Sequence, residues 1–377
     1  MMGIYVDHSS TTPVDPRVLE AMLPFYQEQF FNPSALYPEG RRVQAALGQS
    51  RQTIADYLNC SPEEIIFTSG GTESDNLAVL GVMERLGKKK FITSKIEHHA
   101  ILSATDYLEQ KGFSVVVLPV DEYGFVSPAE LEKNIDDDTA LVSIMWANNE
   151  TGAIQPIEEL CEIAHKHGAL FHTDAVQAIG TQEIDLSKTK VDLLSFSSHK
   201  IYGPKGAGVL FFRKGVELVP RNMGGQQEGF LRGGTENVAC IVGMAKAIEL
   251  LKQEREGRCA KLSDLSDDLL VWVEKLLQDV KINTPKVNRI PGVINMSFKG
   301  VEAEPMMILL GAAGICASMG AACNSSSVEP SHVLKAMQVP ADYIRGSLRI
   351  SFGKDSTAEM PEQIATELDK ILKRIRK

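Results

Sequence analysis

Lys200 stands where a lysine could be chemically reactive. Residues 191–196 form an apolar run long enough for one buried strand, and a Gly-Pro pair at 203–204 then stops regular structure. Lys200 therefore follows closely on a strand end. A lone lysine in such a loop is usually exposed and inert. A desolvated lysine, in contrast, can lose its proton near neutral pH and attack a carbonyl group.

A carboxylate precedes this lysine by one strand–connection–strand unit. Residues 169–174 form an apolar run that ends in Asp174, and Gln177 follows shortly after it. On its own, Asp174 would more often be a helix N-cap. Beside a strand-end lysine, it suits a pyridinium nitrogen, which a carboxylate keeps protonated so that the ring can accept electrons. The pair favours a pyridoxal phosphate site, with Gln177 near the same ring edge.

A glycine turn supplies a candidate phosphate site. The apolar run at 65–69 leads into Gly70, Gly71 and Thr72, and an expected helix begins there. Glycines let the backbone approach a phosphate closely, and a helix start offers free N–H groups with a partial positive charge. The turn lacks the glycine spacing of dinucleotide sites and the lysine of the P-loop. This argues against NAD and ATP and leaves a small phosphate.

Three motifs together resemble one enzyme family. The Ser-x-His-Lys-x-x-Gly-Pro element, the Asp-Ala-x-Gln element and the Gly-Gly-Thr-Glu-Ser element are similar to those of fold-type I pyridoxal-phosphate enzymes of the class V aminotransferase group. Within this group the chain resembles the cysteine desulfurases of the NifS/IscS type. The resemblance runs nearly end to end, from residues 5–13 to residues 349–353.

The elements that must position these residues alternate along the chain. Between residues 65 and 212, seven apolar strand-like runs are separated by helical stretches, which is typical of an α/β protein with a mostly parallel sheet covered on both faces. Ligands of such sheets bind outside the carboxyl ends of the strands. The pattern changes around residue 256, so we place a large cofactor-binding domain with a seven-stranded sheet over 12–256. We expect a smaller α+β domain from 1–11 and 257–377, which carries a mobile cysteine loop at about 314–330.

The resemblance assigns cofactor contacts residue by residue. The phosphate would be held by Gly71, Thr72, Ser197 and His199, and by Thr235 from the other subunit of a homodimer. Gln177 and Asn149 would position the ring, and His98, rather than His99, would stack on it and relay protons.

The substrate carboxylate needs a cation. Arg349 lies on an apolar strand, where an arginine is costly unless it binds an anion, and a bidentate carboxylate suits it. It matches the substrate-binding arginine of the family, and Arg345 is the competing choice. Asn32 matches an Asn-Pro-Ser segment near the substrate, although Leu36 and Tyr37 stand where the family often has a histidine.

Cys323 is the expected nucleophile. Residues 311–331 are small and polar, which makes a poor core segment and a good exposed loop, and an accessible thiol can be deprotonated. In the family a cysteine of this loop receives the sulfur. This chain reads Ser-Met-Gly-Ala-Ala-Cys-Asn instead of Ser-Ser-Gly-Ser-Ala-Cys-Thr. We expect Cys316 to be packed, and the spacing to Cys323 does not support a metal pair.

Bulk properties bound the function classes. The chain has 377 residues, which exceeds the ~250–300 at which a single core stops growing. Its net charge of −10 argues against direct nucleic-acid or anionic-membrane binding. We see neither a membrane-length apolar run nor a signal peptide. Six scattered cysteines without zinc-type spacing favour reduced thiols, no metal site and the cytoplasm.

The resemblance implies a cysteine desulfurase that converts L-cysteine to L-alanine and leaves the sulfur on Cys323 as a persulfide. The sulfur would pass to an acceptor protein, either an iron–sulfur scaffold or a thiolation enzyme. Lys200 would move the substrate α-proton. One alternative is a selenocysteine lyase, or another pyridoxal-phosphate amino-acid lyase, which would depend less on Cys323. Another is a sulfur-carrier platform without turnover, which the retention of Lys200, Asp174 and Cys323 disfavours.

Overall fold

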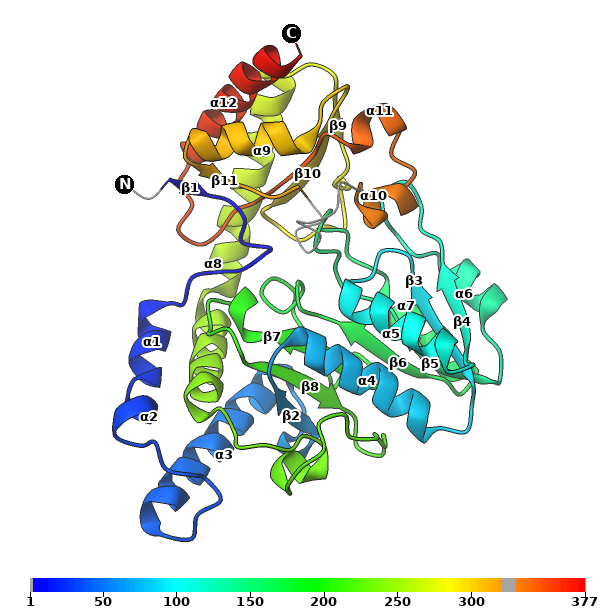
Figure 1. Cartoon of the computed structure of the whole chain (residues 1–377), viewed down its shortest axis with the longest axis vertical. Coiled ribbons are helices and arrows are strands. Elements are labelled where there is room, and N and C mark those ends of the chain that lie inside the picture. The colour runs from blue at the N-terminus through cyan, green and yellow to red at the C-terminus, as the bar shows by residue number, and fades with distance from the viewer. Residues whose placement is uncertain (1–2, 320–329, 377) are drawn as a thin grey trace.

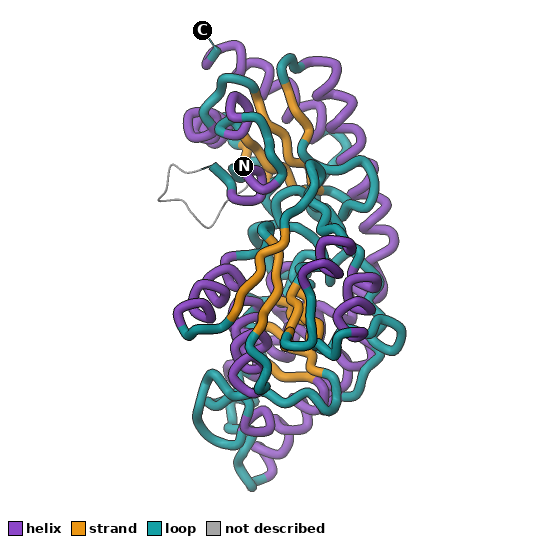
Figure 2. The backbone as a smooth tube through the Cα atoms, turned by 90° about the vertical axis from the view of Figure 1, so that its right-hand side faces the viewer, coloured by secondary structure: helices purple, strands orange, loops and turns teal. Residues whose placement is uncertain are grey.

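The computed structural model describes residues 3–319 and 330–376. Figure 1 shows a large sheet flanked by helices, and a smaller layer of strands and helices near both ends of the chain. The turned view in Figure 2 places the strands of the smaller layer above those of the large sheet. The described part of the chain has no helix that is both long and apolar enough to span a membrane.

The large sheet has seven strands in the order β2-β8-β7-β6-β5-β3-β4. Neighbours from β7 to β4 pair in parallel, whereas β8 is antiparallel to both β7 and β2. The predicted mostly parallel sheet is therefore confirmed. The strands are β2 (Ile65–Thr68), β3 (Lys90–Ser94), β4 (Ser114–Leu118), β5 (Thr139–Ser143), β6 (Leu170–Asp174), β7 (Leu193–Ser197) and β8 (Gly208–Phe212).

Both faces of this sheet are buried. Successive side chains of a strand point to opposite faces, so Leu193 joins the core under α4, while Leu194 joins a second core that also contains side chains of α3 and α8. This explains why the strands are almost continuously apolar. The helices of this part are α3 (Pro38–Leu58), α4 (Gly71–Arg85), α5 (His99–Gln110), α6 (Pro128–Asn134) and α7 (Ile157–Lys166), with short 3-10 turns η1 (Pro62–Glu64), η2 (Ser198–Lys200) and η3 (Gln227–Phe230).

One long helix runs through both regions (Figure 1). α8 (Val238–Leu276) contributes Met244 and Ile248 to the core of the large sheet, and Leu265 and Leu269 to a separate core around the small sheet. The predicted division after residue 256 falls inside this helix. The small layer comprises β9 (Val280–Ile282), β10 (Val293–Phe298), β12 (Ser347–Ser351), α9 (Ala303–Ala312), α10 (His332–Ala336), α11 (Ala341–Ile344) and α12 (Met360–Ile375).

The N-terminal segment bridges the two regions. β1 (Ile4–Tyr5) pairs in parallel with β11 (Ile315–Cys316). The chain then crosses to the large sheet and enters α1 (Pro16–Met22) and α2 (Pro24–Gln27). The expectation that Cys316 is packed is wrong, because in this short strand Ile315 takes the buried position and Cys316 is exposed.

Candidate active site

A cavity of about 370 Å³ lies at the carboxyl ends of the central strands and at the start of α4. It gathers residues that are far apart in the sequence and arrive from the large sheet, the N-terminal segment and β12. Of the residues predicted from the sequence, those that line it are Gly71, Thr72, His98, Asn149, Asp174, Gln177, Ser197, His199, Lys200 and Arg349.

Three predicted residues are not among this cavity's lining. Asn32 is exposed, and its side chain accepts a hydrogen bond from the Ser34 N–H at 2.8 Å. Thr235 is also exposed and borders a separate small cavity beside the end of β2. Cys323 lies outside the described residues.

Asp174 ends β6 and provides a buried carboxyl group. The Val176 N–H donates to its Oδ1 at 2.8 Å, which fixes the side chain in place. Burial raises the pKa of Asp174 to about 6, although this hydrogen bond and the positive charge of Lys200 act in the opposite direction. A cation placed against Asp174 would hold it in the charged form.

Lys200 lies in η2, just after β7, and its ammonium group donates hydrogen bonds to main-chain carbonyl oxygens. Nζ donates to the carbonyl oxygens of Ser9 at 2.5 Å and Ser10 at 2.8 Å. Gln177 donates to the same Ser9 oxygen at 2.9 Å. The N-terminal segment therefore supplies the acceptors that hold the lysine and the glutamine at the cavity. Sequence reasoning missed Ser9 and Ser10, since main-chain acceptors leave no trace in residue type.

In the turn between β2 and α4, glycines allow the backbone to pack closely against neighbouring segments. Gly70 has a φ of +155°, a conformation that favours glycine. A Cβ on Gly71 would lie 2.8 Å from Val176 Cγ2, and one on Gly208 would lie 2.6 Å from the Gly70 Cα. The first N–H groups of a helix have no intrahelical acceptor, so those at the start of α4 can bind an anion beside Thr72.

Two of the histidines that line the cavity, His98 and His199, are neutral. The His98 Nδ1 caps α5 by accepting from the Ala100 N–H at 3.1 Å, so its ring proton lies on Nε2. Burial, and then the charge of Lys200, lower the pKa of His98 to about 4. The same two causes lower the pKa of His199 to about 4, and its Nδ1 lies 3.1 Å from the Thr11 hydroxyl. Both rings can therefore accept or donate a hydrogen bond without adding charge.

Arg349, in the middle of β12, is only 1% exposed. Nη1 donates to the Asn149 carbonyl at 2.8 Å, and Nη2 donates to Asp7 Oδ1 and to Ser10 Oγ, both at 2.7 Å. Its Nε has no partner among the described residues. The competing Arg345 is exposed and pairs with Glu302 at 3.4 Å. The structure thus brings Arg349, and not Arg345, to the cavity with an unfilled donor.

Sequence reasoning also missed the acids buried around the cavity. Glu97 accepts from Ser94 at 2.5 Å and from the Met145 N–H at 3.1 Å, and burial raises its pKa to about 8. Glu150 accepts from Ser331 at 2.5 Å, and burial raises its pKa as well. Glu97 precedes His98 and Glu150 follows Asn149 in the sequence. This adjacency to predicted site residues is the one sequence signal that could have indicated them. Within residues 3–319 and 330–376, no group of His, Cys, Asp or Glu is arranged to hold a metal.

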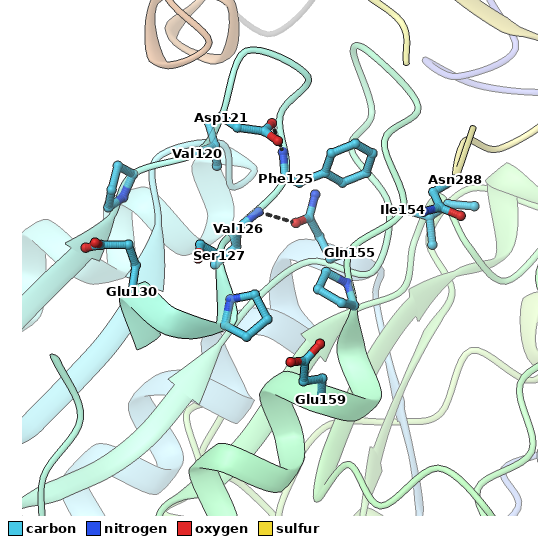
Figure 3. A pocket seen from close by; sticks show the side chains of 13 residues that line it. Val120, Asp121, Phe125, Val126, Ser127, Glu130, Ile154, Gln155, Glu159 and Asn288 are labelled. Carbon is cyan, nitrogen blue, oxygen red and sulfur yellow. Dashed lines mark hydrogen bonds between the residues drawn. The ribbon is translucent and has the colours of Figure 1, made fainter. Parts of the chain in front are cut away.

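A larger cavity, of about 770 Å³, lies elsewhere (Figure 3). Its lining includes Phe125 and Gln155, with the acids Asp121, Glu130 and Glu159, and Gln155 Oε1 accepts from the Val126 N–H at 2.8 Å. Among the described residues that line it there is no lysine, histidine, arginine or cysteine. Lys200, His98 and Arg349 line the smaller cavity instead.

Comparison with known proteins shows what the chain is similar to. Residues 4–363 match the family described as aminotransferase class V. A cysteine desulfurase IscS of Dictyoglomus turgidum is 46% identical, with 99% of this chain and 95% of that protein aligned. A solved NifS-like protein is 40% identical with a TM-score of 0.93, covering 99% of this chain and 100% of its own. A structure titled SspA in complex with cysteine is 35% identical with a TM-score of 0.83, covering 94% and 100%.

Proposed function

The chain belongs to the class V aminotransferase family, and from this premise we propose that it is a pyridoxal-phosphate-dependent cysteine desulfurase. It converts L-cysteine to L-alanine and passes the sulfur to Cys323 as a persulfide. The observation that carries this proposal is one cavity that joins Lys200, Asp174 and Arg349, in a chain whose full-length relatives are named cysteine desulfurases.

The cavity fits pyridoxal 5′-phosphate at three points. Asp174 would hold the ring nitrogen, because a buried carboxyl group gains most from a cation beside it. The start of α4, with Thr72, and the side chains of Ser197 and His199 would hold the phosphate. Lys200 would hold the aldehyde. When bound, the cofactor supplies an electrophilic carbon and a ring that accepts electrons.

The remaining lining residues orient the ring. His98 projects from the N-terminus of α5 and would stack on the ring as an uncharged group, and its Nε2 proton would serve in proton relay. Gln177 and Asn149 would position the ring hydroxyl and the substrate. Because Gln177 is fixed to the Ser9 carbonyl, its side chain is oriented before any ligand binds.

Arg349 binds the substrate carboxylate by exchanging partners. Its guanidinium now donates to Asp7 and Ser10, and its Nε has no partner in the described part of the chain. A carboxylate can accept two parallel hydrogen bonds from one guanidinium, so L-cysteine would replace the Ser10 contact and satisfy Nε. Lys200, once released, would move a proton from the substrate Cα. Asn32 does not line this cavity, and its contact with the substrate stays a proposal.

The sulfur step balances without an external oxidant. The Cys323 thiolate attacks the sulfur of the substrate, an S–S bond forms and the substrate C–S bond breaks. The electron pair of that bond stays on the substrate carbon, which takes up a proton to become alanine. Cys323 is oxidised to the persulfide as the substrate carbon is reduced. A reductant or an acceptor protein, either an iron–sulfur scaffold or a thiolation enzyme, then removes the sulfur.

A second copy of the chain would complete the site. Large apolar side chains stand exposed near the α2–α3 connection and in the loop before α8, including Leu36 at 84% and Met223 at 81%. Apolar side chains of this size are usually covered by a partner when they cluster. Thr235 is exposed in the same loop, so we infer a homodimer in which Thr235 reaches the phosphate of the partner subunit. We place this dimer in the cytoplasm, with no membrane or direct nucleic-acid partner.

The decisive experiment compares alanine and sulfide release from L-cysteine, in the presence of a thiol reductant, for wild type, Cys323→Ser and Cys316→Ser. Cys316 is exposed and serves as the matched control. We expect equal amounts of alanine and sulfide from wild type and Cys316→Ser, and neither from Cys323→Ser. Full activity in Cys323→Ser would instead indicate a lyase of the selenocysteine type, which depends less on an attacking thiolate.

A further inference from the structure

Besides Asp174, two further carboxyl groups line the cavity, those of Asp75 and Glu150, and the reaction described above does not use Asp75. Asp75 lies on α4, about one turn beyond Gly71, and is 1% exposed. Its Oδ1 has no hydrogen-bond partner among the described residues. Burial of an ionised carboxylate with an unpaired oxygen is unfavourable, because nothing replaces the hydration that this oxygen loses. The charge state of Asp75 therefore needs an explanation.

The neighbouring His172 cannot neutralise Asp75. His172 Nε2 lies 3.7 Å from Asp75 Oδ1, and both side chains are fully buried. The imidazole is already bonded on both sides, with Nδ1 2.8 Å from Ser143 Oγ and Nε2 3.0 Å from Ser195 Oγ. Burial lowers the pKa of His172 to about 3, so the ring is neutral near pH 7. No ion pair forms between Asp75 and His172.

The other charges around Asp75 come from three elements. Asp174 on β6 and Glu97 after β3 are acidic, whereas Lys200 on η2 acts on Asp174. Burial, and then repulsion by Asp174, raise the pKa of Asp75 well above its usual range, and a hydrogen bond with Ser195 opposes them only in part. Two interacting buried carboxyl groups do not both ionise readily. The favourable charge of Lys200 assigns the ionised form to Asp174.

We propose that Asp75 is a positioning residue that stays a neutral carboxylic acid, so that the single negative charge at this end of the cavity remains on Asp174. Unlike a carboxylate, a neutral acid has an O–H donor, and this proton gives Asp75 a hydrogen bond to donate within the buried His172–Ser195 cluster. The inference rests on the proposed cofactor, because the charge of Asp174 matters most when a ring nitrogen lies against it.

Three variants separate the charge of Asp75 from its shape. Asp75→Asn keeps the size and a donor without ever ionising, Asp75→Leu removes all polarity, and Asp174→Asn removes the proposed partner of the ring nitrogen. The measurement is the dissociation constant of pyridoxal phosphate, titrated into cofactor-free protein by its visible absorption. We expect Asp75→Asn to stay within about threefold of wild type, and Asp75→Leu and Asp174→Asn to weaken binding about tenfold or more.

Two results would overturn the proposal. If Asp75→Asn lost as much affinity as Asp174→Asn, the charge would reside on Asp75. If Asp75→Leu bound as wild type does, Asp75 would have no role. The infrared spectrum decides independently, even if Asp75→Leu fails to fold. In the difference between the wild-type and Asp75→Asn spectra near pH 7, a C=O band of a protonated carboxyl should remain, with or without cofactor. Glu97, whose pKa is also raised by burial, contributes equally to both proteins and cancels in this difference. Absence of this difference band would refute the neutral acid.

The infrared measurement also keeps the two proposals apart. If the difference band is present but wild type binds no pyridoxal phosphate, the proposed cofactor site is refuted while the protonation of Asp75 is established. If wild type binds the cofactor but the difference band is missing, the cofactor site stands and the neutral form of Asp75 is refuted.

Discussion

Two ion pairs tie the N-terminal segment to the region around β12, and they differ in what surrounds them. In one, Arg349 donates to Asp7 and Ser10 at the wall of the cavity. In the other, Lys354, just after β12, pairs with the buried Asp15 at the start of α1. In both pairs the N-terminal segment supplies the carboxylate, and the region around β12 supplies the cation.

The two pairs differ in unfilled hydrogen-bonding capacity. Asp15 is saturated, because Arg17 binds both of its oxygens, at 3.0 and 2.8 Å, and its own carboxylate caps α1. Lys354 in turn lies over the Tyr202 ring at 4.8 Å. Arg349 instead has an unpartnered Nε in the described structure and faces a cavity. A saturated pair can only stabilise the fold, whereas an unsaturated pair beside a cavity can exchange one partner for a ligand.

The largest effect should come from the lysine on the cavity side of this comparison. Lys200→Ala should lower alanine formation by about a thousandfold or more, since general acid–base groups contribute about 10²–10⁴ in rate and Lys200 would also hold the cofactor. The rate is measured with saturating L-cysteine. Lys205→Ala, an exposed neighbour in the same loop, is the matched control and should behave as wild type. Comparable rates in both variants would contradict the assignment.

Arg349→Lys tests the unsaturated pair directly. The charge stays, but the planar fork that binds a carboxylate bidentately is lost. We expect kcat/KM for L-cysteine to fall about 10- to 100-fold, as for loss of a charged hydrogen bond of about 1.5–3 kcal/mol, mainly through a higher KM. The unfolding midpoint should change little. A fall in the midpoint with unchanged KM would make Arg349 a structural residue.

Asp15→Asn tests the saturated pair and should lower stability while leaving catalysis nearly unchanged. Arg17, and after it Lys354, hold the pKa of Asp15 well below its usual range. Stability gained from a depressed carboxyl pKa is present above the ordinary value near 4 and is lost as the pH falls below it. We expect a loss of about 1–3 kcal/mol at pH 7 that shrinks towards pH 3. Urea unfolding at both pH values measures it, and kcat/KM should stay within about threefold.

The last effect is on the pH dependence of stability and concerns Glu97, which is buried beside the cavity and has no cationic partner among the described residues. Its pKa is raised to about 8 by burial, so the folded protein keeps a proton that the unfolded chain releases near pH 4. This contribution to stability is present at low pH and is lost as the pH rises towards 8. Glu97→Gln should remove that loss, with the difference growing by at most about 1.4 kcal/mol per pH unit. A pH-independent difference in urea midpoints would argue against it.

The sequence predicted the strands and the residues at their ends, but not the contacts that join distant parts of the chain. The seven apolar runs became the seven strands, and Asp174 and Lys200 lie at strand ends as expected. The fold class and the family are confirmed, because strand periodicity and local motifs are properties of short segments. The pairing of Arg349 with Asp7 and Ser10 could not be predicted, since it joins opposite ends of the chain and no local pattern encodes it.

Burial was the other quantity that the sequence left undetermined. Asp75 stands in a polar stretch that suggests an exposed helix start, yet α4 turns it beneath the cavity. Cys316 is the reverse case, because an apolar neighbourhood suggested packing whereas the two-residue strand exposes it. The proposed role of Asn32 involves the substrate, and that of Thr235 involves a second subunit. Cys323 lies outside the described residues.

The contrast between the two ion pairs is tested most directly by one assay on three proteins. Alanine and sulfide released from L-cysteine are measured for wild type, Arg349→Lys and Lys354→Met at substrate concentrations well below KM. The account predicts equal amounts of both products from wild type and Lys354→Met, and a loss of about tenfold or more in Arg349→Lys. If Arg349→Lys kept the wild-type yield, or if wild type released neither product with its cofactor bound, the account would be wrong.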